Sequence, residues 1–128
     1  MNILLDTHVA LWAITDSARL SLRARELIQT PGNTLWISVA SLWEITIKHA
    51  LGRGDMPVSG KNALDYFEQS GYRVLSVEPA HVLAVADLPP HHQDPFDRLL
   101  VAQALSEPMR LMTHDQQILR YSDTVIGV

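Results

Sequence analysis

The chain has 128 residues, of which 47% are hydrophobic and 19% charged, a composition that excludes intrinsic disorder and indicates one domain spanning residues 1–128. The absence of cysteine excludes disulfides, zinc–thiolate sites and thiol nucleophiles, and a net charge of −4 argues mildly against a non-specific nucleic-acid binder. No apolar run approaches the ~20 residues of a transmembrane helix or resembles a signal peptide, so we expect a cytoplasmic protein without a membrane segment.

Short apolar runs alternate with helix-like segments along the chain. Strands are predicted at residues 2–5, 34–38, 73–77, 110–113 and 124–126. Helices are predicted at residues 8–14, 21–29, 39–51, 59–70, 79–87, 95–105 and 116–120, with loops at 53–57 and 88–93. This alternation is typical of an α/β fold in which helices cover a parallel sheet.

Two of the predicted strands are followed by an aspartate. Asp6 comes directly after the strand at residues 2–5, and Asp115 comes just after the strand at residues 110–113. Parallel strands present their carboxyl ends at one edge of a sheet, where α/β proteins bind ligands, so we expect both carboxylates at that edge. The structural alternative is that each aspartate only caps the helix that follows it.

Glu44 lies in a predicted helix, residues 39–51, that is apolar almost all round and is therefore expected to be buried. A buried glutamate is costly unless it is paired, protonated or bound to a cation. The structural alternative is a salt bridge with Lys48, four residues further along. We favour a functional carboxylate at this position.

A further pair of acids flanks a predicted helix start. Asp94 precedes Pro95, and Asp97 falls in the first turn, where the helix dipole favours an acid. Helix capping and the helix dipole explain both residues. Asp97 becomes a candidate site residue only when it is considered together with the three acids above. Carboxylates gathered at one place repel one another, and oxygen ligands select Mg²⁺ or Mn²⁺. Such a site is suited to phosphodiester hydrolysis.

Four motifs occur in an order that resembles the PIN-domain ribonucleases, specifically the VapC-type toxins of bacterial toxin–antitoxin pairs. The motifs are LLDTH at residues 4–8, SVASLWEI at 38–45, DPFDRLLVAQA at 94–104 and MTHD at 112–115. The similarity runs over essentially the whole chain, and four motifs in order are more specific than any one of them. The resemblance implies a PIN-like three-layer sandwich with a parallel sheet of about five strands flanked by helices.

The resemblance also implies a set of site residues. The catalytic and metal-binding acids of the family map onto Asp6, Glu44, Asp97 and Asp115, which would hold Mg²⁺ or Mn²⁺. Three further residues would support the site, namely Thr113, Asp94 and His8. Asp94 is an auxiliary ligand or only a helix cap. His8 stands where many PIN domains have asparagine, and it either hydrogen-bonds a phosphate or carboxylate or is a partly buried residue of the first turn.

The partners implied by the resemblance are an RNA substrate, which is cut endonucleolytically, and a cognate VapB-type antitoxin. The antitoxin is usually encoded beside the toxin and blocks the acidic groove. We also expect a homodimer, because of the resemblance and because of the apolar content near the first helices. The sequence does not identify the RNA that is cut.

Positive charge near the acids would be needed to bind RNA phosphates. Lys48, His49 and Arg53 follow Glu44, and Arg98 follows Asp97, so the candidate RNA contacts are Lys48, Arg53 and Arg98. The alternative for each is an ordinary solvated side chain.

Histidines and tryptophans supply further candidates. His91 and His92 match no helix-borne zinc motif and are better candidates for RNA contacts than for metal ligands. Trp12, Trp36 and Trp43 lie within apolar patterns, which favours packing in the core or at an interface over stacking on RNA bases.

Two other functions are compatible with the same fold. An aspartyl-nucleophile phosphatase or phosphotransferase usually has a second acid two residues after the first, where this chain has His8, and a lysine near the third acid, whereas Lys48 and Lys61 lie elsewhere. A non-catalytic binding module is possible on any fold, although retention of all four acids argues against it.

Overall fold

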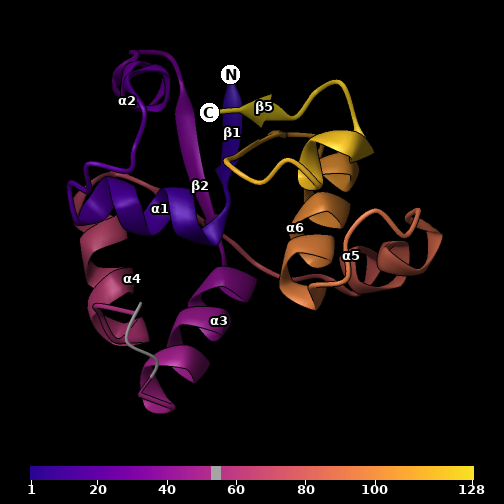
Figure 1. Cartoon of the computed structure of the whole chain (residues 1–128), viewed down its shortest axis with the longest axis horizontal. Helices are drawn as coiled ribbons and strands as arrows, with labels where there is room; N and C mark the ends of the chain where they lie inside the picture. The colour runs from indigo at the N-terminus through magenta and orange to yellow at the C-terminus, as the bar shows by residue number, and fades with distance from the viewer. Residues whose placement is uncertain (53–55) are drawn as a thin grey trace.

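A five-stranded parallel sheet forms the centre of the computed structural model, which describes residues 1–52 and 56–128 (Figure 1). The strands lie in the order β3–β2–β1–β4–β5, and each neighbouring pair is parallel. Their bounds are β1 Asn2–Leu5, β2 Thr34–Ser38, β3 Arg73–Leu75, β4 Arg110–Thr113 and β5 Ile126–Gly127. Parallel strands need crossover connections, which here carry the helices.

The helices of the described residues agree closely with the predicted ones. They are α1 Thr7–Ile14, α2 Leu22–Gln29, α3 Val39–Ala50, α4 Gly60–Gln69, α5 Pro79–Ala84 and α6 Pro95–Ser106, with the 3-10 helices η1 Val85–Asp87 and η2 Ile118–Tyr121. The predicted helix at 79–87 is thus α5 continued by a 3-10 turn. The predicted loop at 53–57 begins in residues outside those described.

Two hydrophobic clusters lie on opposite faces of the sheet. In the central strand β1, Ile3 and Leu5 pack with residues of α1, α2 and α4, whereas Leu4 packs with residues of α6. All three side chains are completely buried, which explains why this strand is a continuous apolar run. Helices therefore cover both faces, as Figure 1 shows, and the predicted three-layer sandwich is confirmed.

The outer strands differ slightly from the predicted ones. β3 ends at Leu75 because its partner β2 has ended there, and the carbonyl of Ser76 instead accepts a hydrogen bond from Gln103 Nε2 at 3.3 Å. β5 begins later than predicted because Ser122 Oγ accepts from the backbone N–H of Thr124 at 3.1 Å and holds a turn before the strand.

A buried polar contact fastens α6 to the start of α3. Ser38 Oγ caps α3 by accepting from the N–H of Ala40 at 3.0 Å, and it donates to Gln103 Oε1 at 2.6 Å. Ser38 and Gln103 are both completely buried. Because α3 carries Glu44 and α6 carries Asp97, this contact sets the relative position of two candidate site residues.

Only part of α3 is buried. The helix leaves the carboxyl edge of β2 and passes below the sheet between α4 and α6, so the sheet covers one side of it (Figure 1). Glu44 and Ile45 are buried, but Trp43 is 60% exposed and Leu51 is 64% exposed. The expectation of a helix buried nearly all round is therefore wrong on one face. Among the described residues, no helix is long and apolar enough to cross a membrane.

Candidate active site

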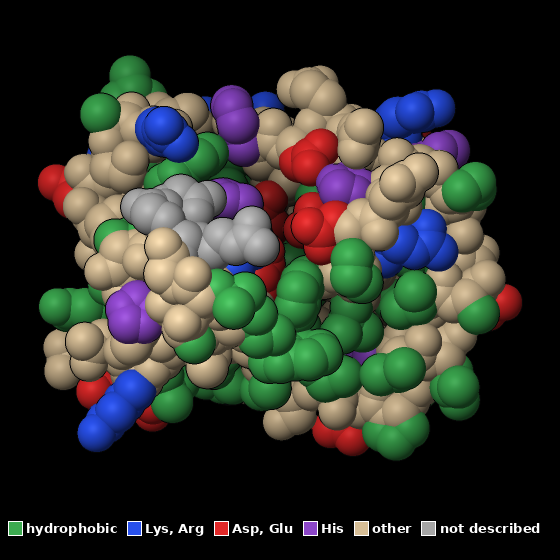
Figure 2. Space-filling model, turned by 60° about the horizontal axis from the view of Figure 1, so that its bottom comes forward, with side chains coloured by type: hydrophobic (Ala, Val, Ile, Leu, Met, Phe, Trp, Pro, Cys, Tyr) green, Lys and Arg blue, Asp and Glu red, His purple; other side chains and the backbone are tan. Residues whose placement is uncertain are grey.

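Acidic side chains from distant parts of the chain meet at the carboxyl edge of the sheet. A cleft of about 370 Å³ opens there, lined by Asp6, His8, Trp12, His92, Asp94, Asp97, His114 and Asp115. Figure 2 shows the acids and histidines gathered in a hollow near the centre of one face. Glu44 is only 2% exposed and is not among the residues that line the cleft, but its charge raises the pKa of Asp97. The edge location predicted from the strand ends is therefore confirmed.

Asp6 is held from two sides. Its Oδ1 accepts from the N–H of Val9 at 2.8 Å, which caps α1, and its Oδ2 accepts a short hydrogen bond from the hydroxyl of Thr113. Thr113 Oγ1 also accepts from the N–H of Asp115 at 3.0 Å. Thr113 thus connects Asp6 to Asp115, the first and last of the four candidate site acids. Burial raises the pKa of Asp6 despite these hydrogen bonds.

Asp94 and Asp97 share the start of α6. Asp94 Oδ1 accepts from the N–H groups of Phe96 at 2.8 Å and Asp97 at 3.3 Å, so the predicted cap is present. Burial raises the pKa of Asp97 to about 7, with further increases from the charges of Asp94, Asp6 and Glu44. His92 acts in the opposite direction. The negative charges of the neighbouring acids therefore make Asp97 harder to deprotonate.

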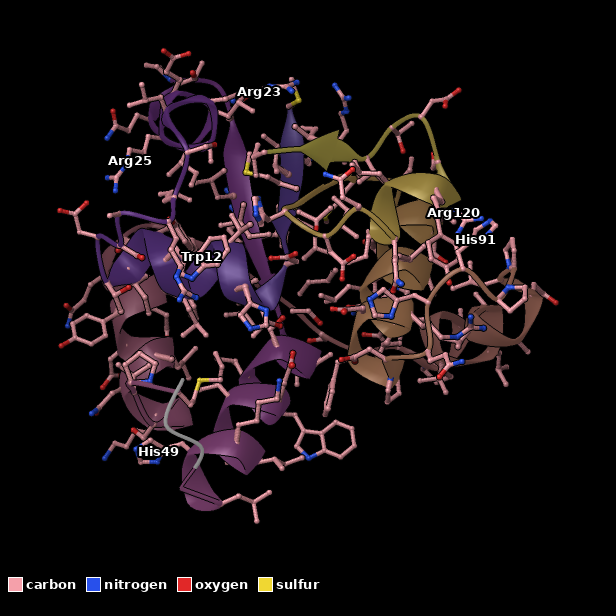
Figure 3. The ribbon with its side chains drawn as sticks, viewed as in Figure 1. Trp12, Arg23, Arg25, His49, His91 and Arg120 are labelled. Carbon is pink, nitrogen blue, oxygen red and sulfur yellow. The ribbon has the colours of Figure 1, made fainter. Side chains whose placement is uncertain are left out.

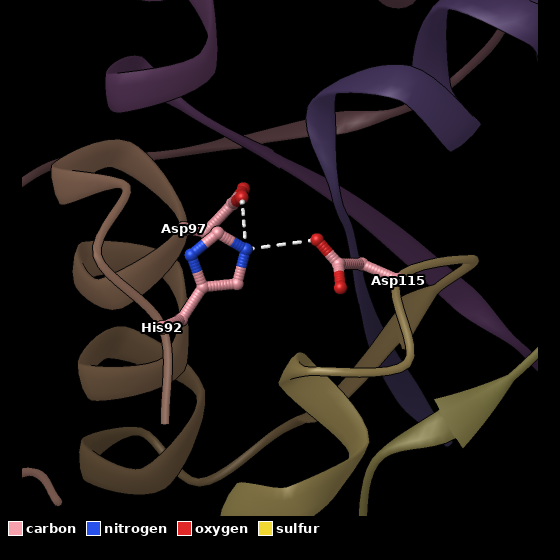
Figure 4. Close-up of side chains that lie close together, drawn as sticks. All are labelled: His92, Asp97 and Asp115. Atoms are coloured by element: carbon pink, nitrogen blue, oxygen red, sulfur yellow. Dashed lines mark hydrogen bonds and ion pairs between the residues drawn. The ribbon is translucent and has the colours of Figure 1, made fainter. Parts of the chain in front are cut away.

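His92 lies between two of the acids (Figure 4). Its Nε2 is 2.8 Å from Asp115 Oδ2 and 3.2 Å from Asp97 Oδ2. Its Nδ1 accepts from the N–H of Asp94 at 3.0 Å, which assigns the ring proton to Nε2 and directs it at both carboxylates. Burial tends to raise the pKa of Asp115, but hydrogen bonds from His92 and from the N–H of Gln117 outweigh it and lower that pKa.

The histidine was not predicted to stand at the centre of the acidic cluster. The sequence placed His92 in a loop as a candidate RNA contact, and only its position two residues before Asp94 hinted at more. One ligand atom each from His92, Asp97 and Asp115 lie within 4.8 Å of one another, close enough to share a metal ion.

Glu44 supplies independent evidence for a cation. Its Oε2 is 2.7 Å from Lys48 Nζ, so the predicted salt bridge is present. Its Oε1 is buried and has no hydrogen-bond partner among the residues that the structure describes. A buried carboxylate oxygen without a partner is costly, and a bound cation would remove that cost. The carboxylate oxygens of the cluster fit Mg²⁺ or Mn²⁺.

The predicted RNA contacts have different outcomes. Arg98 donates to the carbonyls of Pro89, His92 and Val85 at 3.1–3.3 Å, and also to the Tyr121 hydroxyl at 3.3 Å. The prediction that it contacts RNA is not supported by this geometry, because its guanidinium fastens the loop that carries His92. Lys48 pairs with Glu44, and Arg53 lies outside the described residues.

The remaining histidines divide between the cleft and its surroundings. His8 is exposed and lines the cleft, so the alternative of a partly buried residue is wrong. The ring of His91 contacts that of Tyr121, with centroids 5.0 Å apart. His49 is exposed near the end of α3, away from the cleft, as Figure 3 shows.

Without divalent ions, the protein is predicted to lose stability as the pH rises from about 4 to about 7. The folded state keeps a proton on Asp97 up to a pKa of about 7, whereas an ordinary aspartate has a value of 3.8. The folded state therefore binds more protons across this window, and its free energy of unfolding falls as the pH rises, by ~4 kcal/mol at most. Urea unfolding in EDTA at a series of pH values measures this change.

The variant Asp97→Asn isolates this contribution. It should remove most of the pH dependence between these values, whereas Asp65→Asn, which changes an exposed aspartate of α4, should retain it. If the free energy of unfolding changed with pH equally in the wild type and in Asp97→Asn, the raised pKa of Asp97 could not be the cause of the change.

Comparison with known proteins identifies the family. Residues 3–123 match the PIN domain family. Ribonuclease VapC22 of Mycobacterium tuberculosis is 27% identical over 118 residues, which cover 91% of this chain and 89% of that protein. Among solved structures, VapBC2 from Rickettsia felis bound to a DNA fragment from their promoter has a chain with a TM-score of 0.72 and 19% identity, covering 100% of this chain and 98% of that one.

A second similar structure extends the comparison to another organism. A chain of VapBC-1 from nontypeable Haemophilus influenzae has a TM-score of 0.66 and 18% identity, covering 100% of this chain and 97% of that one. These structural similarities show the shared fold, and the family match spans nearly the whole sequence. The chain belongs to the PIN-domain family.

Proposed function

We propose that this protein is a metal-dependent endoribonuclease and the toxin of a VapBC-type toxin–antitoxin pair. The observation that carries the proposal is the convergence of Asp6, Glu44, Asp97 and Asp115 at the carboxyl edge of a PIN-family sheet. A relative named as a ribonuclease and similar chains in VapBC assemblies support it. The catalytic unit is a single domain over residues 1–128, acting in the cytoplasm.

The four acids are the groups that would hold Mg²⁺ or Mn²⁺. When bound, such an ion lowers the pKa of an attacking water and stabilises charge on the phosphate. Thr113 keeps the Asp6 carboxylate in place through its hydroxyl. His92 presents an N–H to Asp97 and Asp115, and His8 lines the same cleft, where it is available to a phosphate oxygen.

The alternatives are less well supported. An aspartyl nucleophile needs an unencumbered oxygen, but both oxygens of Asp6 accept hydrogen bonds and the residue is 5% exposed. Of the two lysines, Lys48 pairs with Glu44 and Lys61 lies on α4. A binding module without catalysis would have no need to bury these acids together, where burial and then their mutual repulsion raise the pKa of Asp97.

The first test is cleavage of RNA. Purified wild-type protein incubated with total RNA and Mg²⁺ or Mn²⁺ should cut at defined positions, which can be mapped by sequencing the new ends, and EDTA should stop the cutting. Asp6→Asn should lower the rate at least ~100-fold, because it weakens a charge that would hold the ion. Asp65→Asn is the control and should cut at the wild-type rate. An active Asp6→Asn enzyme would count decisively against the proposal.

The same variants test the role as a toxin. Expression of the wild type in a bacterial host should stop growth, expression of Asp6→Asn should not, and co-expression of an antitoxin encoded beside this gene should restore growth. If both the wild type and Asp6→Asn stopped growth, the toxicity would not depend on the acidic site.

We further propose that a second copy of the chain covers an apolar patch next to the acids. The patch is lined by Trp43, Val82, Val85, Pro95, Phe96 and Leu99 around a hollow of about 250 Å³. Figure 2 shows apolar side chains spread over this part of the surface. The sequence pointed to apolar content near the first helices. In α1, Val9, Ala10 and Leu11 are buried in the core and only the apolar residues after Leu11 are partly exposed, so we place the contact at this patch.

Light scattering at micromolar concentration should therefore give the mass of a dimer. Trp43→Arg, which puts a charge at the centre of an exposed aromatic contact with Phe96, should shift the protein to monomer, because burying an unpaired charge is costly. A monomeric wild type would contradict this part of the proposal.

A further inference from the structure

A second hollow adjoins the acidic cleft. It has a volume of about 310 Å³, and its lining includes His8, Trp12, Thr15, Ser17 and Arg19. His8 and Trp12 also line the acidic cleft, so the two hollows share these two side chains among the described residues. We refer to the acidic cleft and the second hollow together as the trench. A chain of nucleotides with its phosphate at the acids would continue into this second hollow.

Trp12 forms the shared wall of the trench. The indole packs against the core below it, and its ring centroid lies 6.2 Å from that of His8 and 5.5 Å from that of His114. The two histidine rings are inclined to the indole by 48° and 71°, so neither lies parallel to it. Figure 3 labels Trp12 on α1, above the start of α3. Trp12 is partly exposed and lines both hollows, so part of the indole is accessible to a ligand, and neither histidine is stacked parallel on it.

The chemistry of the second hollow differs from that of the first. The described residues that line it include no acid, and Arg19 is exposed without an ion pair within residues 1–52 and 56–128. The acidic cleft and a net charge of −4 both repel a polyanion, so long-range attraction contributes little to RNA binding. Stacking of a base on an aromatic ring does not depend on net charge and contributes ~1–3 kcal/mol per base.

We infer that Trp12 is a stacking platform for an unpaired base adjacent to the phosphate that is cut, with Arg19 beside it for a backbone phosphate. This inference rests on the proposed ribonuclease function and assigns a residue that would position the substrate next to the acidic cleft. In a duplex both faces of each base are covered by neighbouring bases, so a paired strand offers no face to the indole. The sequence favoured packing of Trp12 in the core or at an interface, and Trp12 does pack against the core.

The test compares binding of three labelled probes by fluorescence anisotropy in EDTA at low salt, where no cleavage occurs. The probes are a short oligoadenylate, an oligomer of the same length without bases, and the oligoadenylate annealed to its complement. Trp12→Leu should weaken binding of the single strand about 5- to 150-fold and leave the baseless oligomer and the duplex unchanged. Trp12→Phe, which keeps an aromatic face, should recover most of the lost affinity.

Trp36→Leu is the matched control. Trp36 lies on β2, where its Nε1 donates to Asn2 Oδ1 at 3.1 Å, and this contact is at the opposite end of the sheet from the acids. It should bind all three probes as the wild type does. Equal losses for the single strand and the baseless oligomer in Trp12→Leu, or no loss in either, would overturn the inference.

Cleavage assays separate this result from the proposed function. If the wild type cuts RNA but Trp12→Leu binds oligoadenylate as tightly as the wild type, the stacking role of Trp12 is rejected. The proposed ribonuclease function is not affected by that result. A wild type that cuts no RNA would remove the proposed function itself. A wild type that binds no oligoadenylate overturns the inference.

Discussion

The mutual repulsion of carboxylates at one edge of the sheet is the constraint on which this site depends. Burial and three neighbouring acids raise the pKa of Asp97 to about 7, and Glu44 keeps one buried oxygen without a partner among the described residues. Such an arrangement persists only if the rest of the fold holds it. The Ser38–Gln103 contact between α3 and α6 and the Thr113 hydroxyl between β1 and β4 supply that restraint.

Two kinds of group can relieve the repulsion, a hydrogen-bond donor and a cation. In this structure the Nε2–H of His92 points between Asp97 and Asp115, and Arg98 fastens the loop that places it there. The same ligand atoms are spaced to share a metal ion, so the histidine and a cation act on the same carboxylates. The loop before α6 is therefore part of the site and not only a connection to it.

The sequence was sufficient for most of the fold and for the location of the site. Apolar runs and helix starts predicted the strands and helices of the described residues to within two residues, except that the helix predicted at 79–87 is α5 followed by the 3-10 helix η1. The acids after β1 and β4 marked the functional edge. Contacts between distant loops could not be predicted from the sequence, because they depend on three-dimensional packing. Neither the central position of His92 nor the engagement of Arg98 with loop carbonyls has a periodic signal. The predicted core packing of Trp12 is present, and its place in the wall of the cleft has no signal in the sequence.

The most direct test of the account is a calorimetric titration of Mn²⁺ into the purified protein at neutral pH. The account predicts saturable binding that is lost in Asp97→Asn and retained in Asp65→Asn, because the clustered carboxylates, and not acidic groups in general, hold the ion. Absence of binding to the wild type, or equal binding to both variants, would contradict the claim that these acids are gathered to share a cation.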